Sequence, residues 1–178
     1  RLRTVTGVQT CALPIWRLHD ARRRVAEPLL HRQALDHHPA QAADVEIAFV
    51  KPHGALYNQA CRDRELARVV VAACALYDLP VVGLPGSALE MEAHEIVTFI
   101  AEGFADRRYR PDGTLIPRSE PDAFVRDPAE AIKQVEWLIR EHGVRTICVH
   151  GDNADAVAFT KAVRGSLLEK GFKFQAFA

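Results

Sequence analysis

From residue 45 onward, hydrophobic and polar positions occur in blocks that predict strands and helices in turn. Short apolar runs predict strands, and longer stretches with apolar residues three or four positions apart predict amphipathic helices. The predicted strands are 45–50, 79–84, 96–101, 144–149 and 172–177, and the predicted helices are 63–77, 87–95, 128–142 and 153–170. Strands that alternate with helices through short links predict an α/β fold with a parallel sheet covered by helices.

The ends of these helices carry local signals. Asp63 is placed to cap the first long helix, and Asp127 followed by Pro128 is placed to begin the next. Gly143 and Gly171 follow the last two helices and predict their ends. A long polar stretch, 103–119, separates the two halves of the pattern and predicts a loop.

Residues 1–44 do not share this pattern. Residues 5–15, VTGVQTCALPI, match the translation of a common short-read sequencing adapter. Residues 16–44 lack Gly, Ser, Thr, Lys, Asn, Phe, Tyr and Ile, which is typical of GC-rich DNA read out of frame. The alternative for this segment is an Arg-rich helix interrupted at Pro28. We expect a non-native N-terminus over 1–44 and a domain over 45–178.

Composition excludes several classes of function. The chain has 178 residues, enough for one domain with a substantial core, and 23 basic residues balance 23 acidic ones. This balance argues against a nucleic-acid or membrane-surface partner. There is no membrane-length apolar run, no GxGxxG and no P-loop. The cysteines lack metal-type spacing, and Cys74 and Cys148 lie in apolar segments as predicted buried thiols, which favours a cytoplasmic location.

Polar residues whose side chains can take part in catalysis or ligand binding follow three of the predicted strands. The first group is Lys51, His53, Tyr57 and Asn58; the second is Glu102, Asp106, Arg107, Tyr109 and Arg110; the third is His150 and Asp152. In parallel α/β folds, ligand sites lie at the carboxyl ends of strands, so we expect these groups to share one rim. Each residue also has an ordinary explanation: a histidine can simply be a hydrogen-bonded loop residue, and Asp152 can cap the following helix.

Taken together, these groups favour hydrolysis. Two histidines beside carboxylates allow proton transfer near neutral pH. Lysine and arginine beside them can hold an anionic substrate or stabilise a developing oxyanion.

Three segments resemble the signature segments of the LamB/YcsF family, the A subunits of 5-oxoprolinase: VKPHGALYN (50–58), AEGFADRRYRPDGTLIPRS (101–119) and ICVHGDN (147–153). The resemblance implies a (β/α) barrel similar to polysaccharide deacetylases, incomplete and seven-stranded in the family. It also implies ATP-dependent opening of 5-oxo-L-proline to L-glutamate together with two partners, the B and C subunits of 5-oxoprolinase.

The resemblance implies that these positions belong to the catalytic site, and their individual roles are our hypotheses. His53 and His150 are the acid–base candidates, Lys51 would steady developing negative charge or a phosphate, and Asp106, Asp152 or Glu102 would orient a histidine or a water. Arg107, Arg110 or Arg118 would hold the substrate carboxylate. Tyr57, Asn58 and Tyr109 are the other expected substrate-binding positions. ATP is the expected co-substrate, and use of a divalent metal stays open.

Three further segments of the family pattern, similar to DLNADLGE, AxGFHAGD and GAHP, are absent from the sequence. We therefore expect a C-terminal portion of such a protein that lacks the N-terminal strands and is inactive alone. Two alternatives stay open. One is a metal-dependent deacetylase-like hydrolase with His53 and His150 as ligands, and the other is a non-catalytic scaffold for partner subunits.

Overall fold

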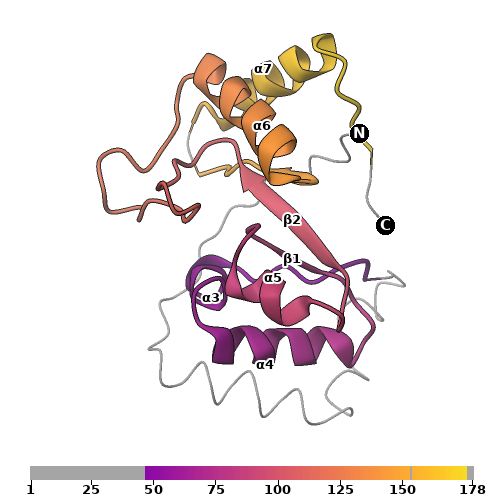
Figure 1. The fold of residues 1–178 in the computed structure, drawn as a ribbon. Coiled ribbons are helices and arrows are strands. Elements are labelled where there is room, and N and C mark those ends of the chain that lie inside the picture. Colours follow the sequence, from indigo (N-terminus) through magenta and orange to yellow (C-terminus); the bar gives the residue numbers. More distant parts are fainter. Residues whose placement is uncertain (1–46, 153, 176–178) are drawn as a thin grey trace. The chain divides into compact units, whose positions relative to one another are not determined.

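The computed structural model describes residues 47–152 and 154–175 (Figure 1). They fall into two compact units. Of the described residues, the α3–α5 unit comprises 47–83 and 87–99, and the C-terminal unit comprises 84–86, 100–152 and 154–175. The non-native N-terminus that the sequence predicts lies outside the described residues, as do the first residues of the predicted strand 45–50.

The α3–α5 unit contains a short strand and three helices. Their bounds are α3 Gly54–Ala60, α4 Arg64–Ala75, β1 Val81–Gly83 and α5 Ala88–Ala93. Val50 forms a parallel bridge with Val81: its N–H donates to the Pro80 carbonyl at 2.8 Å, and its carbonyl accepts from Val82 at 2.9 Å. Within the described part of the predicted first strand, pairing is therefore limited to Val50.

Helix α4 begins as its sequence predicts. The Asp63 carboxylate accepts from the N–H groups of Glu65 at 3.0 Å and Leu66 at 3.2 Å. Such a cap stabilises a helix by about 1 kcal/mol. The apolar face of α4 packs into a core with α5 and β1, and burial in this core raises the pKa of Cys74 to about 11. The prediction of a buried thiol at Cys74 is confirmed.

Helix α3 was not predicted. It starts at Gly54, whose φ of +56° lies in the left-handed region that favours glycine. His53 occupies the N-cap position without a side-chain capping bond, so the sequence carries no capping signal here.

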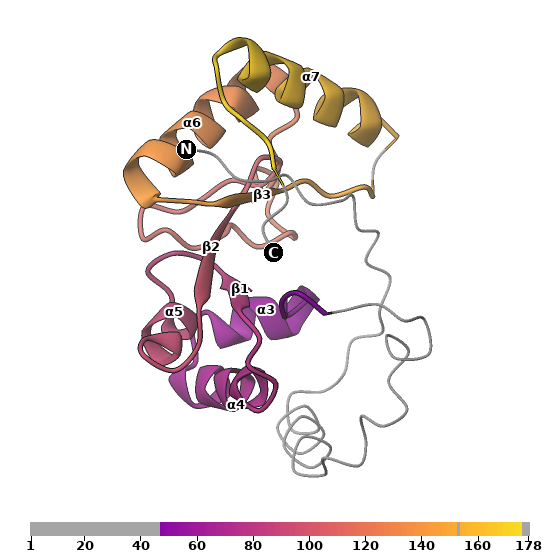
Figure 2. The same ribbon diagram turned by 90° about the vertical axis from the view of Figure 1, so that its right-hand side faces the viewer.

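The C-terminal unit is built on two parallel strands and two helices. Strand β2, Phe99–Phe104, enters it from the α3–α5 unit, and it is followed by α6 (Pro128–His142), β3 (Thr146–Cys148) and α7 (Ala156–Glu169). Strands β2 and β3 are parallel, with Phe104 opposite Cys148. Figure 2 shows α6 and α7 side by side above β3. The prediction of an α/β fold with parallel strands is confirmed.

Strand β2 lies three residues later than predicted, because the N–H groups of Ile96 and Val97 both donate to the Ala93 carbonyl. These two apolar residues therefore form the turn after α5 and not the start of the strand. The shift places Glu102 inside β2, opposite Thr146 and 1% exposed. The prediction that Glu102 follows the strand is wrong.

Helix α6 has both predicted end signals. Asp127 accepts from the Ala129 N–H at 3.0 Å, and Gly143 ends the helix with φ +62°. Gly103 lets this helix approach β2 closely, since a Cβ there would lie 2.9 Å from Leu138 and 3.2 Å from Val144. The helix thereby closes a core with β3 and α7.

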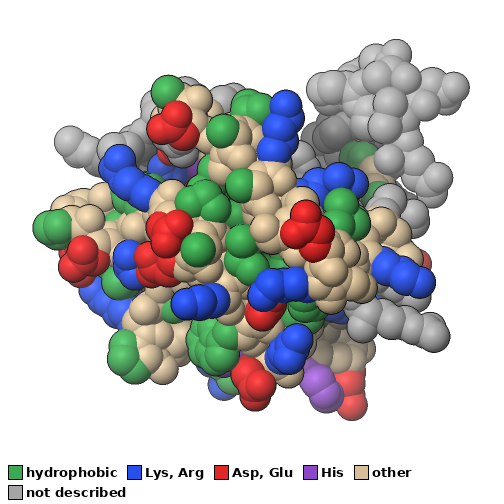
Figure 3. Space-filling model, turned by 90° about the horizontal axis from the view of Figure 1, so that it is seen from above, with side chains coloured by type: hydrophobic (Ala, Val, Ile, Leu, Met, Phe, Trp, Pro, Cys, Tyr) green, Lys and Arg blue, Asp and Glu red, His purple; other side chains and the backbone are tan. Residues whose placement is uncertain are grey.

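The polar stretch after β2 is folded against itself. Antiparallel bridges join Tyr109 to Leu115 and Arg107 to Phe124. Beyond α7, residues 172–175 of the predicted last strand are not in a strand, and the end of that prediction lies outside the described residues. Over α6 and α7, basic and acidic side chains are interspersed with hydrophobic ones (Figure 3). No helix in the described ranges is both long and apolar enough to cross a membrane.

Candidate active site

The carboxyl ends of β2 and β3 bring Asp106 and His150 together. Each residue lies two positions beyond a strand end, Asp106 after Phe104 and His150 after Cys148, and the two strand ends are paired. The Asp106 carboxylate accepts from the His150 backbone N–H at 2.9 Å, and the ring Nδ1 lies 2.9 Å from its Oδ2. The two side chains are 8% and 12% exposed, so water competes little for this contact.

This contact sets the tautomer and the orientation of the histidine. A carboxylate at Nδ1 favours the tautomer with its proton on Nδ1, which leaves the lone pair of Nε2 available. The Phe104 ring stacks on the imidazole, with centroids 5.6 Å apart and planes inclined by 11°. Ring orientation is therefore set by Asp106 and Phe104 together. An imidazole held in this way by a carboxylate is the arrangement that a general base requires.

Asp152 is part of an exposed ion pair. Its carboxylate lies 2.7 Å from the Arg118 guanidinium, and both side chains are a little under half exposed. The hydrogen bond from Arg118 holds the pKa of Asp152 below its usual value. Helix α7 begins later, at Ala156 after the N-cap residue Asp155, so the alternative that Asp152 caps this helix is wrong.

Arg107 is buried beneath the loop that carries Arg118. Its guanidinium donates to the backbone carbonyls of Ala123 and Ile116. Burial lowers the pKa of Arg107, and the nearby Arg118 acts in the same direction. Arg107 therefore holds the two ends of the segment 116–123, and its predicted contact with a substrate stays a prediction.

Tyr109 and Arg110 lie on the bridged loop. The Tyr109 hydroxyl accepts from the Phe104 N–H at 2.7 Å, and burial raises the pKa of this phenol. Arg110 pairs with Glu120 at 2.8 Å in an exposed position. Tyr109 thus supports the end of β2, while the predicted roles of both residues in substrate binding stay predictions.

Two residues that the sequence did not single out complete this region. The Gln134 amide on α6 donates to the carbonyls of Phe104 and Arg107, each at 2.8 Å. Its signal was a polar residue on the apolar face of a helix, between Ala131 and Leu138. The other is Phe124, whose ring lies 5.3 Å from the guanidinium carbon of Arg107 and 5.6 Å from that of Arg118. No sequence pattern marks that contact.

The remaining candidates belong to the α3–α5 unit. Lys51 and His53 are half-buried and directly follow the bridged Val50, as predicted. Tyr57 is buried on α3, and the Asn58 amide donates to the Gly54 carbonyl at 3.0 Å. That these four residues share a rim with His150 stays a prediction. Among the described residues, no cluster of three or more His, Cys, Asp or Glu side chains could hold a metal ion.

Comparison with known proteins identifies the family. The model of the LamB/YcsF family matches residues 22–178. The chain belongs to the LamB/YcsF family. The resemblance drawn from the three signature segments is thereby confirmed.

Curated LamB/YcsF relatives are named as the A subunit of 5-oxoprolinase. The relative from Neisseria meningitidis serogroup C is 45% identical over 148 residues, covering 74% of this chain and 60% of its own length. The relative from Pyrococcus furiosus is 43% identical, covering 75% of this chain and 58% of its own length. This LamB/YcsF chain therefore spans about three-fifths of the relatives that it matches.

A solved structure shares the fold. It is described as a lactam utilization protein from Thermus thermophilus, with a TM-score of 0.71 and 34% identity. The match covers 87% of this chain and 68% of the other. The names of the curated relatives and of this solved structure all refer to lactam chemistry, since 5-oxoproline is a lactam.

Proposed function

We propose that this chain is the C-terminal part of the A subunit of an ATP-dependent 5-oxoprolinase, which cleaves 5-oxo-L-proline to L-glutamate. The observation that carries the proposal is the Asp106–His150 pair at the paired ends of β2 and β3. The names of the relatives support the substrate, because they combine a 5-oxoprolinase component with a lactam utilization protein. The naming of the relatives as one lettered component supports further subunits, which we propose to be the B and C subunits.

Hydrolysis of a lactam requires a base to deprotonate water and a means of activating the stable amide. In the proposed reaction, Nε2 of His150 takes a proton from water as the water oxygen attacks the lactam carbonyl carbon. The bond from that carbon to the ring nitrogen then breaks, and the nitrogen leaves as the amino group of glutamate. ATP, bound with the partner subunits, would activate the lactam by phosphorylating its carbonyl oxygen, with ADP as the leaving group. Cleavage of the carbon–nitrogen bond would then leave an acyl phosphate, and a second water would hydrolyse it to the side-chain carboxylate of glutamate and inorganic phosphate.

The candidate residues of the two units have separate proposed parts in the reaction. Asp106 keeps the Nδ1 proton in place and stabilises the imidazolium that forms. Water is restricted around the pair because both side chains are almost fully buried. His53 is the proposed acid that protonates the leaving nitrogen, and Lys51 the proposed cation that steadies negative charge.

The test uses a hybrid chain, in which the N-terminal part of the Neisseria meningitidis relative is joined to residues 45–178 of this chain. The hybrid chain is assembled with the B and C subunits from the same bacterium and supplied with 5-oxo-L-proline and ATP. We expect formation of equal amounts of glutamate and phosphate. The intact Neisseria meningitidis relative is the positive control, and the 178-residue chain alone is expected to give no turnover.

Two results would contradict the proposal. A hybrid chain that assembles with its partners but produces no glutamate, while the positive control does, would favour a scaffold without catalytic residues. Hydrolysis by the hybrid chain without ATP or partners, accompanied by stoichiometric zinc, would instead favour a metal-dependent deacetylase-like hydrolase.

A further inference from the structure

Two exposed ion pairs in the C-terminal unit have similar geometry and different surroundings. Arg118–Asp152 and Arg110–Glu120 are 2.7 and 2.8 Å long, and all four side chains are between 41% and 47% exposed. Exposed pairs of this kind contribute little to stability, typically about 0–1 kcal/mol. Asp152, however, is two residues from His150 in the chain, and a positive charge on this imidazole acts to lower the pKa of Asp152. The Arg118–Asp152 pair therefore lies next to the proposed base.

The segment 116–123, which carries Arg118, is held by hydrogen bonds from the buried Arg107. Arg107 donates to the carbonyl of Ile116 on one side of Arg118 and to that of Ala123 on the other. Next along the chain, the Phe124 ring lies within cation–π distance of both guanidinium groups. Since Arg107 is 4% exposed, it has little access to a ligand, whereas the Arg118 side chain is 44% exposed. Of these two arginines, Arg118 is the one that a substrate can reach.

We propose that Arg118 is the anchor for the substrate's carboxylate, and that Asp152 holds this anchor in place until that carboxylate displaces it. The inference rests on the proposed function and names the group of the substrate that Arg118 recognises. One carboxylate replaces another, so the charge balance around Arg118 is kept during the exchange. Phe124 and the two bonds of Arg107 keep the guanidinium positioned while its partner changes, which limits the ordering cost of binding.

The experiment measures binding by the 178-residue chain and does not need turnover. Two lactams are titrated by isothermal calorimetry: 5-oxo-L-proline, which carries a carboxylate, and 2-pyrrolidinone, which lacks it. We expect the wild-type chain to prefer 5-oxo-L-proline. Arg118→Gln should weaken 5-oxo-L-proline binding by roughly 10- to 100-fold, the effect of losing a charge-assisted hydrogen bond, and leave 2-pyrrolidinone binding unchanged.

Asp152→Asn separates the holding role from a direct contact. Removing the competing carboxylate should strengthen 5-oxo-L-proline binding by about two- to fivefold, the equivalent of an exposed ion pair. Arg126→Gln is the matched control, because it removes an exposed arginine that also lies between β2 and α6 and has no described partner, and it should change neither affinity. Circular dichroism of each variant checks that the fold is retained.

The outcomes are distinct. A wild-type chain without preference between the two lactams, an Arg118→Gln effect equal for both, or weaker 5-oxo-L-proline binding in Asp152→Asn would each overturn the inference. Failure of the proposed function would show separately, as an absence of glutamate formation by the assembled hybrid chain.

Discussion

Glu92 and Asp106 are both buried carboxylates, yet their partners give them different capacities. Glu92, on α5, accepts hydrogen bonds from Arg64 at 2.5 Å and Arg68 at 2.8 Å, and both arginines come from α4. Asp106 accepts from the backbone and ring of His150. Their side chains are similarly little exposed, 9% for Glu92 and 8% for Asp106. Burial of a carboxylate alone therefore does not distinguish a structural site from a chemical one.

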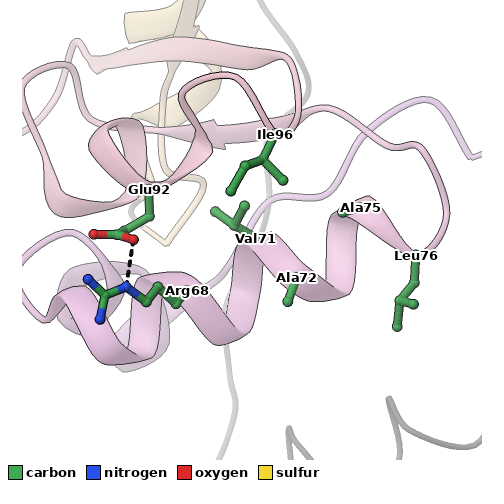
Figure 4. Close-up of a pocket in the computed structure, with 7 residues that line it drawn as sticks. All are labelled: Arg68, Val71, Ala72, Ala75, Leu76, Glu92 and Ile96. Atoms are coloured by element: carbon green, nitrogen blue, oxygen red, sulfur yellow. Dashed lines mark hydrogen bonds and ion pairs between the residues drawn. The ribbon is translucent and has the colours of Figure 1, made fainter.

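The two carboxylates differ in whether the side chain paired with them can release a proton. A guanidinium keeps its proton at any pH that a protein tolerates, so Arg64, Arg68 and Glu92 can only join two helices. An imidazole exchanges its proton near neutral pH and has a second nitrogen to do so. Figure 4 shows the Arg68–Glu92 contact beside a pocket whose other lining residues are all apolar: Val71, Ala72, Ala75, Leu76 and Ile96. The surroundings of Glu92 thus offer no group for proton transfer within this pocket.

The largest expected effect is a loss of turnover when His150, the partner of Asp106, is substituted. In the assembled hybrid chain, His150→Gln should lower kcat by about 10²–10⁴-fold, the range for loss of a general base. His94→Gln is the control, since His94 is exposed and lies in the α3–α5 unit. Equal kcat values for the two variants would show that His150 does not transfer a proton.

A smaller effect should follow from loosening the support of Asp106. Gln134→Ala leaves the carbonyls of Phe104 and Arg107 without their side-chain donor, which should lower the free energy of unfolding by about 1–3 kcal/mol. Urea unfolding of the 178-residue chain measures this loss. Lys133→Ala, at an exposed neighbouring position, should change it by less than about 0.5 kcal/mol. A loss in Lys133→Ala as large as that in Gln134→Ala would contradict the supporting role.

The smallest expected effect is on the stability of the folded chain at acidic pH. The hydrogen bond from Arg64 lowers the pKa of Glu92 in the folded state, so the unfolded chain binds this proton more readily. The Glu92 contribution is therefore present above the usual glutamate pKa and is lost as the pH falls through the lowered folded value. Thermal unfolding between neutral pH and about pH 3 should show a smaller acid-induced loss in Glu92→Gln than in the wild-type chain. Identical losses would mean that the two arginines do not stabilise the charged form.

Local signals predicted much of this fold. Asp63 and Asp127 begin their helices and Gly143 ends one as the sequence predicts, because capping depends on residues within one turn. Strand β2 was misplaced by three residues because apolar character does not separate a turn such as Ile96–Val97 from a strand. Helix α3 was missed because its first turn has no capping side chain.

The sequence predicts which residues could form the candidate site, but not which of their side chains contact one another. The position of Asp106 beside His150 depends on the register that puts Phe104 opposite Cys148. The contacts of Phe124 depend on how the polar loop folds back, and periodicity carries no information on that. The sequence around Asp152 indicates a helix cap, which is a local role, whereas its partner Arg118 is 34 positions away in sequence.

The central claim is that Asp106 acts through His150, whereas Glu92 takes no part in the reaction. The most direct test is kcat for Asp106→Asn, His150→Gln, the double variant and Glu92→Gln, each in the assembled hybrid chain. We predict that Asp106→Asn loses about 10²–10⁴-fold, that the double variant is no slower than His150→Gln, and that Glu92→Gln equals wild type. Losses that multiply in the double variant, or a loss in Glu92→Gln as large as that in Asp106→Asn, would contradict the claim.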